Sequence, residues 1–276
     1  MKYFIDALKY NGKNLIKMAV FALIPAFFIG GLIQPYCLSN FYAQYDELVV
    51  SSYSSIFGAF FNFNWQNVIV SLLGLLLLIF IVSVIMGIIE RHMRTGKFSL
   101  SESTTFLNNN FLIVFAYFAL LLFLYFATMV VISLILFVMH ILMSGTGNIP
   151  TTSNYILSYV VGIGLFLLFF YFATIIFLSI PETISTGYSV PNCIGNTAEN
   201  LGKKARKAYF SFVVVLLIHF PIAILSFGTW WQVLANILSI FLYICYFCTV
   251  NYIIYFDANN ISREDTHKFK FRFFKG

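Results

Sequence analysis

All sixteen lysine and arginine residues fall into four short clusters, at 2–17, 91–97, 203–207 and 263–275. The three stretches between these clusters are apolar and nearly free of charge, and each is long enough for two helices that span a bilayer. Basic residues beside membrane spans stay on the cytoplasmic side. The pattern therefore predicts an all-α, polytopic transmembrane bundle of six spans with both termini in the cytoplasm.

The composition is that of an integral membrane protein. Hydrophobic residues make up 61% of the chain and charged residues 9%, against roughly 25% charged residues in ordinary soluble domains. The formal charge of +6 lies beside the spans, so we expect contact with anionic lipid headgroups and no binding of nucleic acid. One membrane domain is expected to use all 276 residues.

Hydropathy divides the chain into successive segments. Residues 1–17 are predicted to form an amphipathic interfacial helix, because their charged side chains fall within a sector of roughly 80° at helical spacing. Six transmembrane helices occupy 18–256, and 257–276 form a basic, aromatic cytoplasmic tail that is either a lipid-surface anchor or a solvated end. The expected spans are about 18–38, 68–89, 111–143, 155–180, 209–227 and 231–256.

The third apolar run, 111–143, is longer than a bilayer requires. As a helix it would measure about 50 Å, so it must tilt, bend or project beyond the hydrocarbon. The loops at 41–65 and 144–150 contain no lysine or arginine and are predicted to lie outside. On the cytoplasmic side, Ser99 and Glu102 have the spacing of a capping box, and Pro191 is suited to begin a short helix.

The three hairpins resemble one unit used three times: an amphipathic elbow, a span, an outer loop and a returning span. Thr95-Gly96 after the second span matches Thr186-Gly187 after the fourth. This order of elements predicts a bundle with pseudo-threefold character, in which amphipathic helices form a collar at the cytoplasmic face.

The elbow-and-hairpin order, the Glu90–Lys97 segment and the proline-containing spans resemble a broad group of little-characterised bacterial six-helix membrane proteins. That group is similar to the membrane domain of some glycerophosphodiester phosphodiesterases. The resemblance implies a multi-pass protein of the bacterial plasma (inner) membrane. It does not imply phosphodiesterase activity, because we find no soluble catalytic domain in this chain.

Small residues recur at every fourth position of the first span, at Ala22, Ala26 and Gly30. Such a ridge lets another helix approach closely. We therefore predict a helix contact along this ridge, either within the bundle or between subunits.

Three polar residues inside the expected spans are candidate sites. His219 lies near the middle of the fifth span, where an ionisable group is a functional candidate such as a proton relay. The alternative is a neutral imidazole that donates to a backbone carbonyl freed by Pro221. Asn236 and Asn251 in the sixth span are expected to act as interhelical contacts, with solute binding as the alternative.

Acidic residues lie near the cytoplasmic ends of the even-numbered spans, at Glu90, Glu182 and Asp257. They could form an acidic ring that attracts cations. The simpler interpretation is that these carboxylates pair with nearby basic residues such as Arg91 and Lys203.

No pattern in the chain predicts a catalytic, cofactor-binding or metal site. We find no nucleophile with a histidine and an acid, no paired carboxylates at mid-membrane and no glycine-rich phosphate loop. Cys245-x-x-Cys248 lies in an apolar span, where packing is the expected role. We therefore expect an accessory or scaffold for another membrane component, with another membrane protein or a second copy of the chain as its partner. The alternative is a transporter or channel for a small solute or a lipid-like molecule.

Overall fold

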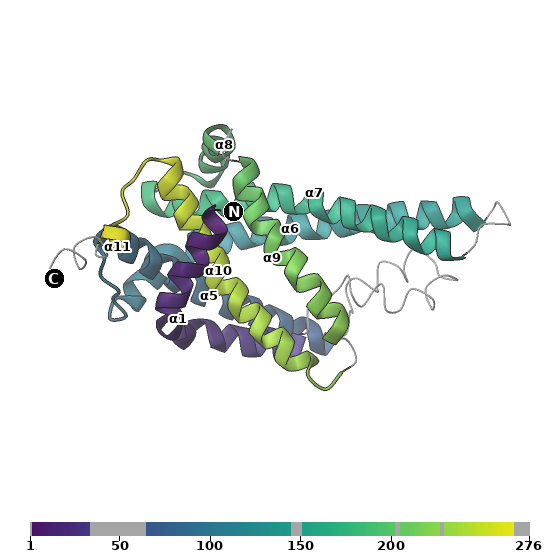
Figure 1. Ribbon diagram of the computed structural model, residues 1–276, viewed down its shortest axis with the longest axis horizontal. Helices are drawn as coiled ribbons and strands as arrows, with labels where there is room; N and C mark the ends of the chain where they lie inside the picture. The colour runs from purple at the N-terminus through teal and green to yellow at the C-terminus, as the bar shows by residue number, and fades with distance from the viewer. Residues whose placement is uncertain (1, 34–64, 145–150, 202–204, 227–228, 268–276) are drawn as a thin grey trace.

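The computed structural model describes residues 2–33, 65–144, 151–201, 205–226 and 229–267. Helices without strands make up this part of the chain, which confirms the all-α prediction (Figure 1). The elements are α1 Lys2–Phe28, the π-helix η1 Ile29–Ile33, α5 Trp65–Thr95, α6 Ser103–Ser144, α7 Thr151–Thr186, α8 Val190–Leu201, α9 Ala205–Ser226, α10 Gln232–Ala258 and α11 Glu264–His267.

Five of the described helical segments are long and apolar enough to cross a membrane. The expected fifth span, 209–227, coincides with α9, which is not one of these five. The predicted outer loops lie almost entirely outside the described residues, as does the tail 268–275. The five segments are Lys2–Gly31, Ile69–Thr95, Ser103–Met139, Ile163–Thr186 and Gln232–Ala258.

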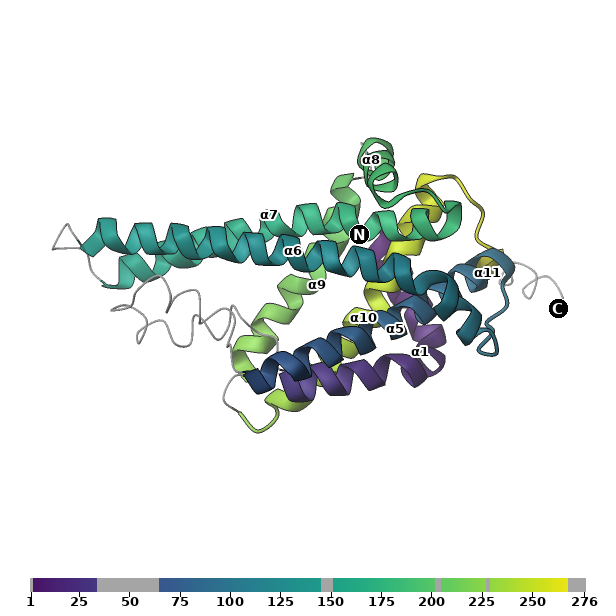
Figure 2. The ribbon, with the colours of Figure 1, turned by 180° about the vertical axis from the view of Figure 1, so that it is seen from behind.

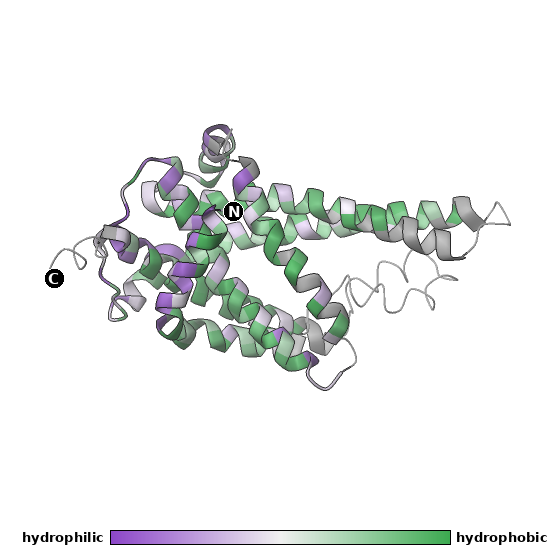
Figure 3. Ribbon diagram, viewed as in Figure 1, coloured by the Kyte–Doolittle hydropathy of each residue, from purple (hydrophilic) through white to green (hydrophobic). Residues whose placement is uncertain are grey.

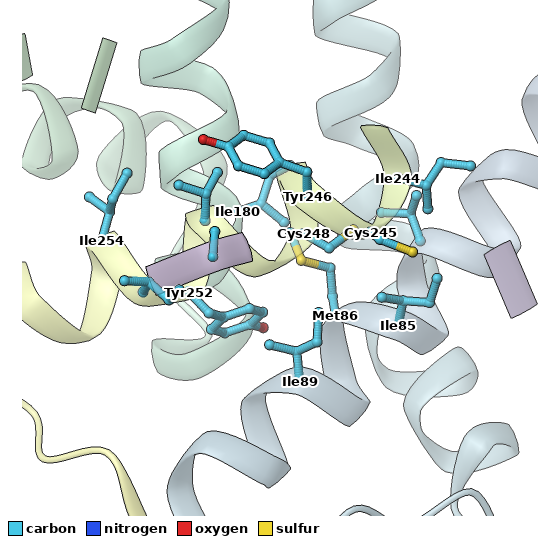
Figure 4. Packing of buried hydrophobic residues seen from close by; sticks show 14 of the residues in the cluster. Ile85, Met86, Ile89, Ile180, Ile244, Cys245, Tyr246, Cys248, Tyr252 and Ile254 are labelled. Carbon is cyan, nitrogen blue, oxygen red and sulfur yellow. The ribbon is translucent and has the colours of Figure 1, made fainter. Parts of the chain in front are cut away.

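Helix α10 is the centre of the bundle and contacts α1, η1, α5, α7 and α9. Residues 248–256 are buried without interruption, so this part of α10 is covered on every side. A helix that is apolar all round belongs in such a position. Figure 4 shows side chains of α5 and α7 packed around it, with Met86 beside Cys248.

The predicted interfacial helix and the first span form one continuous helix, α1, with no break between residues 17 and 18. Figure 1 shows that α1 nevertheless changes direction within its length. Its buried face was not expected: Tyr3, Ala7 and Tyr10 lie against the bundle, while Leu8 and Leu15 are exposed. The amino-terminal part of α1 thus has a protein-facing stripe beside its charged stripe and its exposed apolar stripe.

Helices α6 and α7 form a long antiparallel hairpin. The 42 residues of α6 correspond to about 63 Å of helix, and both views show the hairpin extending beyond the other helices (Figures 1 and 2). The fourth span was expected to end at about 180, but α7 continues through Pro181 to Thr186. Proline removes one backbone donor, and the helix tolerates that loss here.

The two matching dipeptides noted in the sequence end their helices in the same way. Gly96 and Gly187 adopt left-handed φ angles of 67° and 72°, and each donates its N–H to the carbonyl four residues earlier, at 2.8 and 2.9 Å. The hydroxyls of Thr95 and Thr186 also donate to carbonyls four residues earlier. Helix α10 is likewise followed by a left-handed residue, Asn260. The sequence match therefore marks a shared helix stop.

The predicted capping box at Ser99 and Glu102 is wrong. The Ser99 hydroxyl lies 3.0 Å from the hydroxyl of Ser101, and α6 begins only at Ser103. The Glu102 carboxylate instead pairs with Arg91. A full positive charge attracts this carboxylate more strongly than the backbone N–H of a cap.

Figure 3 shows that hydrophilic residues gather at one end of the bundle, around α8, α11 and the carboxyl end of α10. We call this region the polar end. The α6–α7 hairpin extends away from it (Figures 1 and 3).

Candidate functional site

The acidic residues of the polar end bind donors from neighbouring helices. Glu90 on α5 accepts hydrogen bonds from Arg94, at 3.0 Å, and from the Ser185 hydroxyl of α7, at 2.9 Å. Glu182 on α7 accepts from the Thr197 hydroxyl of α8 at 2.7 Å. These two carboxylates therefore connect α5 to α7 and α7 to α8.

Asp257 makes the corresponding connection between α10 and α1. It accepts from the Tyr3 hydroxyl at 2.5 Å and lies 3.7 Å from the Lys2 ammonium. Arg91, the expected partner of Glu90, pairs with Glu102 instead. Glu90 pairs with Arg94, because Arg94 lies one turn further along the same face of α5. Lys203 lies outside the described residues.

A second contact between α1 and α5 uses residues that the sequence did not single out. The Tyr10 hydroxyl lies 2.8 Å from His92 Nδ1, and the His92 ring meets the edge of Phe98. The Lys17 ammonium lies 4.9 Å from the centre of the same Phe98 ring. A signal was present, because Tyr3, Ala7 and Tyr10 repeat at helical spacing between the charged residues.

The small-residue ridge faces α10 of the same chain. Ala22 and Ala26 are fully buried. A Cβ atom on Gly30 would lie 2.7 Å from the backbone nitrogen of Ile237. The backbones of η1 and α10 thus approach so closely that only glycine fits at position 30 without a shift of main chain.

Asn236 and Asn251 are both almost completely buried on α10. Fifteen residues separate them, which is about 22 Å along the helix, so they do not form one site. Asn236 Nδ2 and Asn251 Oδ1 have no hydrogen-bond partner among the described residues. The polar contact between α1 and α10 is instead made by Thr249, whose hydroxyl donates to Asn11 Oδ1 at 2.7 Å.

His219 belongs to α9, and Pro221 lies in the same helix. The His219 side chain lies outside the part of the chain that the structure describes. Its expected role, as a proton relay or as a structural donor, therefore stays a prediction.

An apolar pocket of about 180 Å³ lies between α10 and the helices α5, α6 and α7, with η1 at one end. Asn251 and Tyr243 are among its lining residues, but the surface that lines the pocket is wholly apolar. Met86 and Cys248 from facing helices also line it, and Figure 4 shows these two side chains close together. The pocket is not sealed, so an apolar group can reach it from outside the bundle.

Within the described residues, no group of three or more His, Cys, Asp or Glu side chains could hold a metal ion. A cavity at the polar end beside Glu182 and Thr197 has a volume of only about 20 Å³, room for little more than one water molecule. Comparison of the chain with protein-family models, curated proteins and solved structures finds no match. What the protein does must therefore be inferred from its own helices and pockets.

Proposed function

We propose that the protein is a multi-pass membrane protein without a catalytic centre that acts as an accessory or scaffold for another membrane component. The contacts of the polar end support this role, since Glu90, Glu182 and Asp257 each receive hydrogen bonds from a neighbouring helix. Carboxylates that accept such hydrogen bonds hold neighbouring helices in fixed positions relative to one another. A scaffold requires that rigidity.

The length of α6 is the observation that carries the proposal. Its apolar run, 111–143, measures about 50 Å as a helix and still spans about 38 Å at a steep tilt of about 40°. The hydrocarbon core is only about 30 Å thick. Apolar side chains near the far end, Leu134 and Val138, are exposed in this chain. Measured from residue 111 at that tilt, Val138 would lie at the lipid boundary and Leu134 about 4 Å inside it. We propose that another membrane protein, or a second copy of this chain, covers them.

The proposed orientation places the polar end and both termini in the cytoplasm of a bacterial cell, in its plasma membrane. The exposed lysines of α1 would then meet anionic headgroups, and the tip of the α6–α7 hairpin would face outward. Labelling of single cysteines with an impermeant reagent tests this arrangement in a background without the native cysteines. We expect labelling from outside at positions 46 and 147. Labelling from outside at 94 or 204 would contradict the orientation.

Site-specific crosslinking tests the scaffold role. A photoreactive amino acid at position 134 or 138 should give a discrete protein adduct in native membranes, whose mass distinguishes a second copy from a different protein. Phe123 is the matched control, because its side chain is 71% exposed but lies about 18 Å into the apolar run, within the lipid. Equal adducts at 123 and 138, or none at 134 and 138, would count against the proposal.

A second candidate function, the binding or transport of a lipid-like molecule, is favoured by the apolar pocket beside α10. His219 would be the test residue if a transported solute were coupled to protons. Proton-dependent uptake into vesicles by the wild-type protein, lost in a well-folded His219→Asn variant, would establish transport in place of the scaffold role. Uptake that is absent in both proteins would exclude proton-coupled transport of the solute tested.

A further inference from the structure

The apolar pocket beside α10 has the size of a cavity that holds one small ring. Its volume of about 180 Å³ exceeds the roughly 150 Å³ of an engineered apolar cavity that binds benzene. Because the surface that lines the pocket is wholly apolar, a charge or a hydroxyl group placed there would lose its hydrogen bonds to water without replacement. The pocket therefore fits an uncharged molecule without polar groups.

Nearly parallel aromatic rings form part of the lining. Phe177 of α7 and Phe247 of α10 both line the pocket, and their ring planes differ by 9° at a centroid distance of 6.0 Å. Phe212 of α9 extends the same stack, with its ring plane 13° and its centroid 5.3 Å from those of Phe247. An aromatic molecule in the pocket can stack offset or edge-to-face against such rings, which contributes free energy beyond that of the buried area.

Sulfur atoms from two helices add to this preference. Met86 of α5 and Cys248 of α10 line the pocket, and their side chains lie close together (Figure 4). Sulfur makes favourable contacts with aromatic rings, often at the ring edge. A saturated ring of similar size has no π system for either kind of contact, so the lining favours an aromatic occupant.

Lipid chains are the competing occupant of the pocket. The lining residues of α5 and α10 belong to segments that are long and apolar enough to cross a membrane. Because lipid tails are as apolar as the lining, apolarity alone selects neither occupant. A flexible chain that enters the pocket loses the freedom of its rotatable bonds, whereas a rigid ring has no such freedom to lose. The shape of the pocket and its aromatic lining therefore decide in favour of the ring.

We propose that this pocket binds a small aromatic hydrocarbon of one ring, such as benzene or toluene, which reaches it through the bilayer. The ligand is held by contacts with the phenylalanine rings and the two sulfur atoms, without a hydrogen bond. This inference goes beyond the scaffold role and does not depend on it. Binding at this pocket and partner contact at the tip of α6 involve different residues and are measured separately.

NMR of the methionine methyl groups tests the proposal, with purified protein in lipid nanodiscs and benzene as the probe. The ring of bound benzene should shift the Met86 signal, and that shift should saturate as benzene is added. Met93 is the control within the core, because it is fully buried on the same helix but does not line the pocket. Met139 of α6 is half-buried and reports benzene that is merely dissolved in the lipid. The Met86 signal is identified by its absence from the spectrum of a Met86→Leu variant.

Two competitors separate the contributions to binding. Each displaces benzene, and its affinity is compared with that of benzene at equal concentration in the bilayer. Cyclohexane has a similar size but no π system, so it should bind about fivefold more weakly. Phenol carries a hydroxyl group that the lining cannot bond, so it should bind about tenfold more weakly.

A pair of phenylalanine substitutions on α5 assigns the binding to this pocket. Val82 lines the pocket, so Val82→Phe should fill it and abolish the benzene shift at Met86. Leu73→Phe is the matched control, because it adds the same ring to the same helix at a side chain that is 53% exposed. It should leave the affinity for benzene unchanged.

The wild-type protein alone can overturn the proposal, whether or not Val82→Phe folds. A Met86 shift that rises in step with that of Met139 and never saturates would show only benzene dissolved in lipid. Cyclohexane that binds as tightly as benzene would exclude selection by the rings and sulfur atoms. Phenol that binds more tightly than benzene would show a polar group in the pocket. An unchanged benzene shift in folded Val82→Phe would assign the binding elsewhere.

Discussion

Helices α10 and α6 are both long and apolar, yet they differ in how much of their surface the protein covers. In their most apolar windows, half of α10 is buried but only 28% of α6. The more apolar of the two helices is thus the more exposed one. Buried positions of α10 include Asn236, Thr249 and Asn251, whereas α6 exposes side chains such as Leu112 and Phe123.

This difference teaches that hydropathy identifies spans but does not rank them by burial. In a bilayer, lipid tails are as apolar as leucine, so little is gained by hiding apolar side chains from them. Helices associate through close packing and hydrogen bonds, which favour small and polar residues at contacts. We therefore expect substitutions on α10 and its neighbours to destabilise the bundle. Similar substitutions at exposed positions of the α6–α7 hairpin should alter only its external contacts.

The largest effect is expected at the closest backbone contact. Gly30→Leu should reduce the free energy of unfolding by more than about 3 kcal/mol, at the upper end of overpacking costs, because the new side chain meets the backbone of Ile237. Gly164→Leu on α7 is the matched control, since nothing lies within 4 Å of a Cβ atom there. Unfolding by SDS titration in micelles measures both. Equal losses of unfolding free energy in the two variants would contradict the proposed difference between the contacts of α10 and the α6–α7 hairpin.

A smaller loss is expected from a cavity on α5 where it faces the core. Ile89 is fully buried, and Ile89→Ala should cost about 2 kcal/mol. That value is at the low end for such truncations. An isoleucine side chain gains little free energy by moving from lipid into the protein core, so the cost comes mainly from lost packing contacts. Phe123→Ala on the exposed face of α6 removes more atoms but should change the same free energy by less than about 0.5 kcal/mol. A larger loss at Phe123 would show that the hairpin face is covered within the protein.

The buried hydrogen bond between α1 and α10 should contribute about 1 kcal/mol. Asn11→Leu leaves the Thr249 hydroxyl free to bond within its own helix, so its cost should be lower than that of Thr249→Val, which strands the amide of Asn11. The double variant should cost less than the sum of the two. Strict additivity in chemical or thermal unfolding would mean that the two side chains do not interact.

The smallest effect on stability is expected at the hairpin tip, where function is proposed. Val138→Ser should change the free energy of unfolding by less than about 0.5 kcal/mol while lowering recovery of the partner in mild detergent. Phe123→Ser, on the same helix but within the lipid, should leave recovery unchanged. Loss of recovery in both variants would point to a general defect of α6 in place of a contact at its tip.

Periodicity and charge were sufficient to predict the helical class and five helices long and apolar enough to cross a membrane, whereas the remaining expected span, 209–227, stays a prediction. The shared stop at Thr95-Gly96 and Thr186-Gly187 was also visible, since a left-handed residue favours glycine. The end of the fourth segment expected at about 180 was wrong, because α7 continues through Pro181 to Thr186.

The contacts of the candidate site could not be predicted in the same way. The sequence contains Tyr3 and Asn11 on an amphipathic helix, but nothing local indicates that Asp257 and Thr249 lie opposite them. Asn251 was identified as a buried amide, yet its missing partner and the pocket beside it depend on four helices at once. Such sites arise from tertiary packing, which a single pattern of spacing does not determine.

Helices α1 and α10 pack together although the ribosome makes them at very different times. Asn11 and Thr249 are 238 residues apart, and ribosomes add about 5 to 20 residues each second, so roughly 10 to 50 seconds separate their synthesis. During that interval the Asn11 amide of α1 lacks its eventual partner. Assembly of this bundle is therefore completed only when α10, its central helix, has been synthesised and packs against the helices made before it.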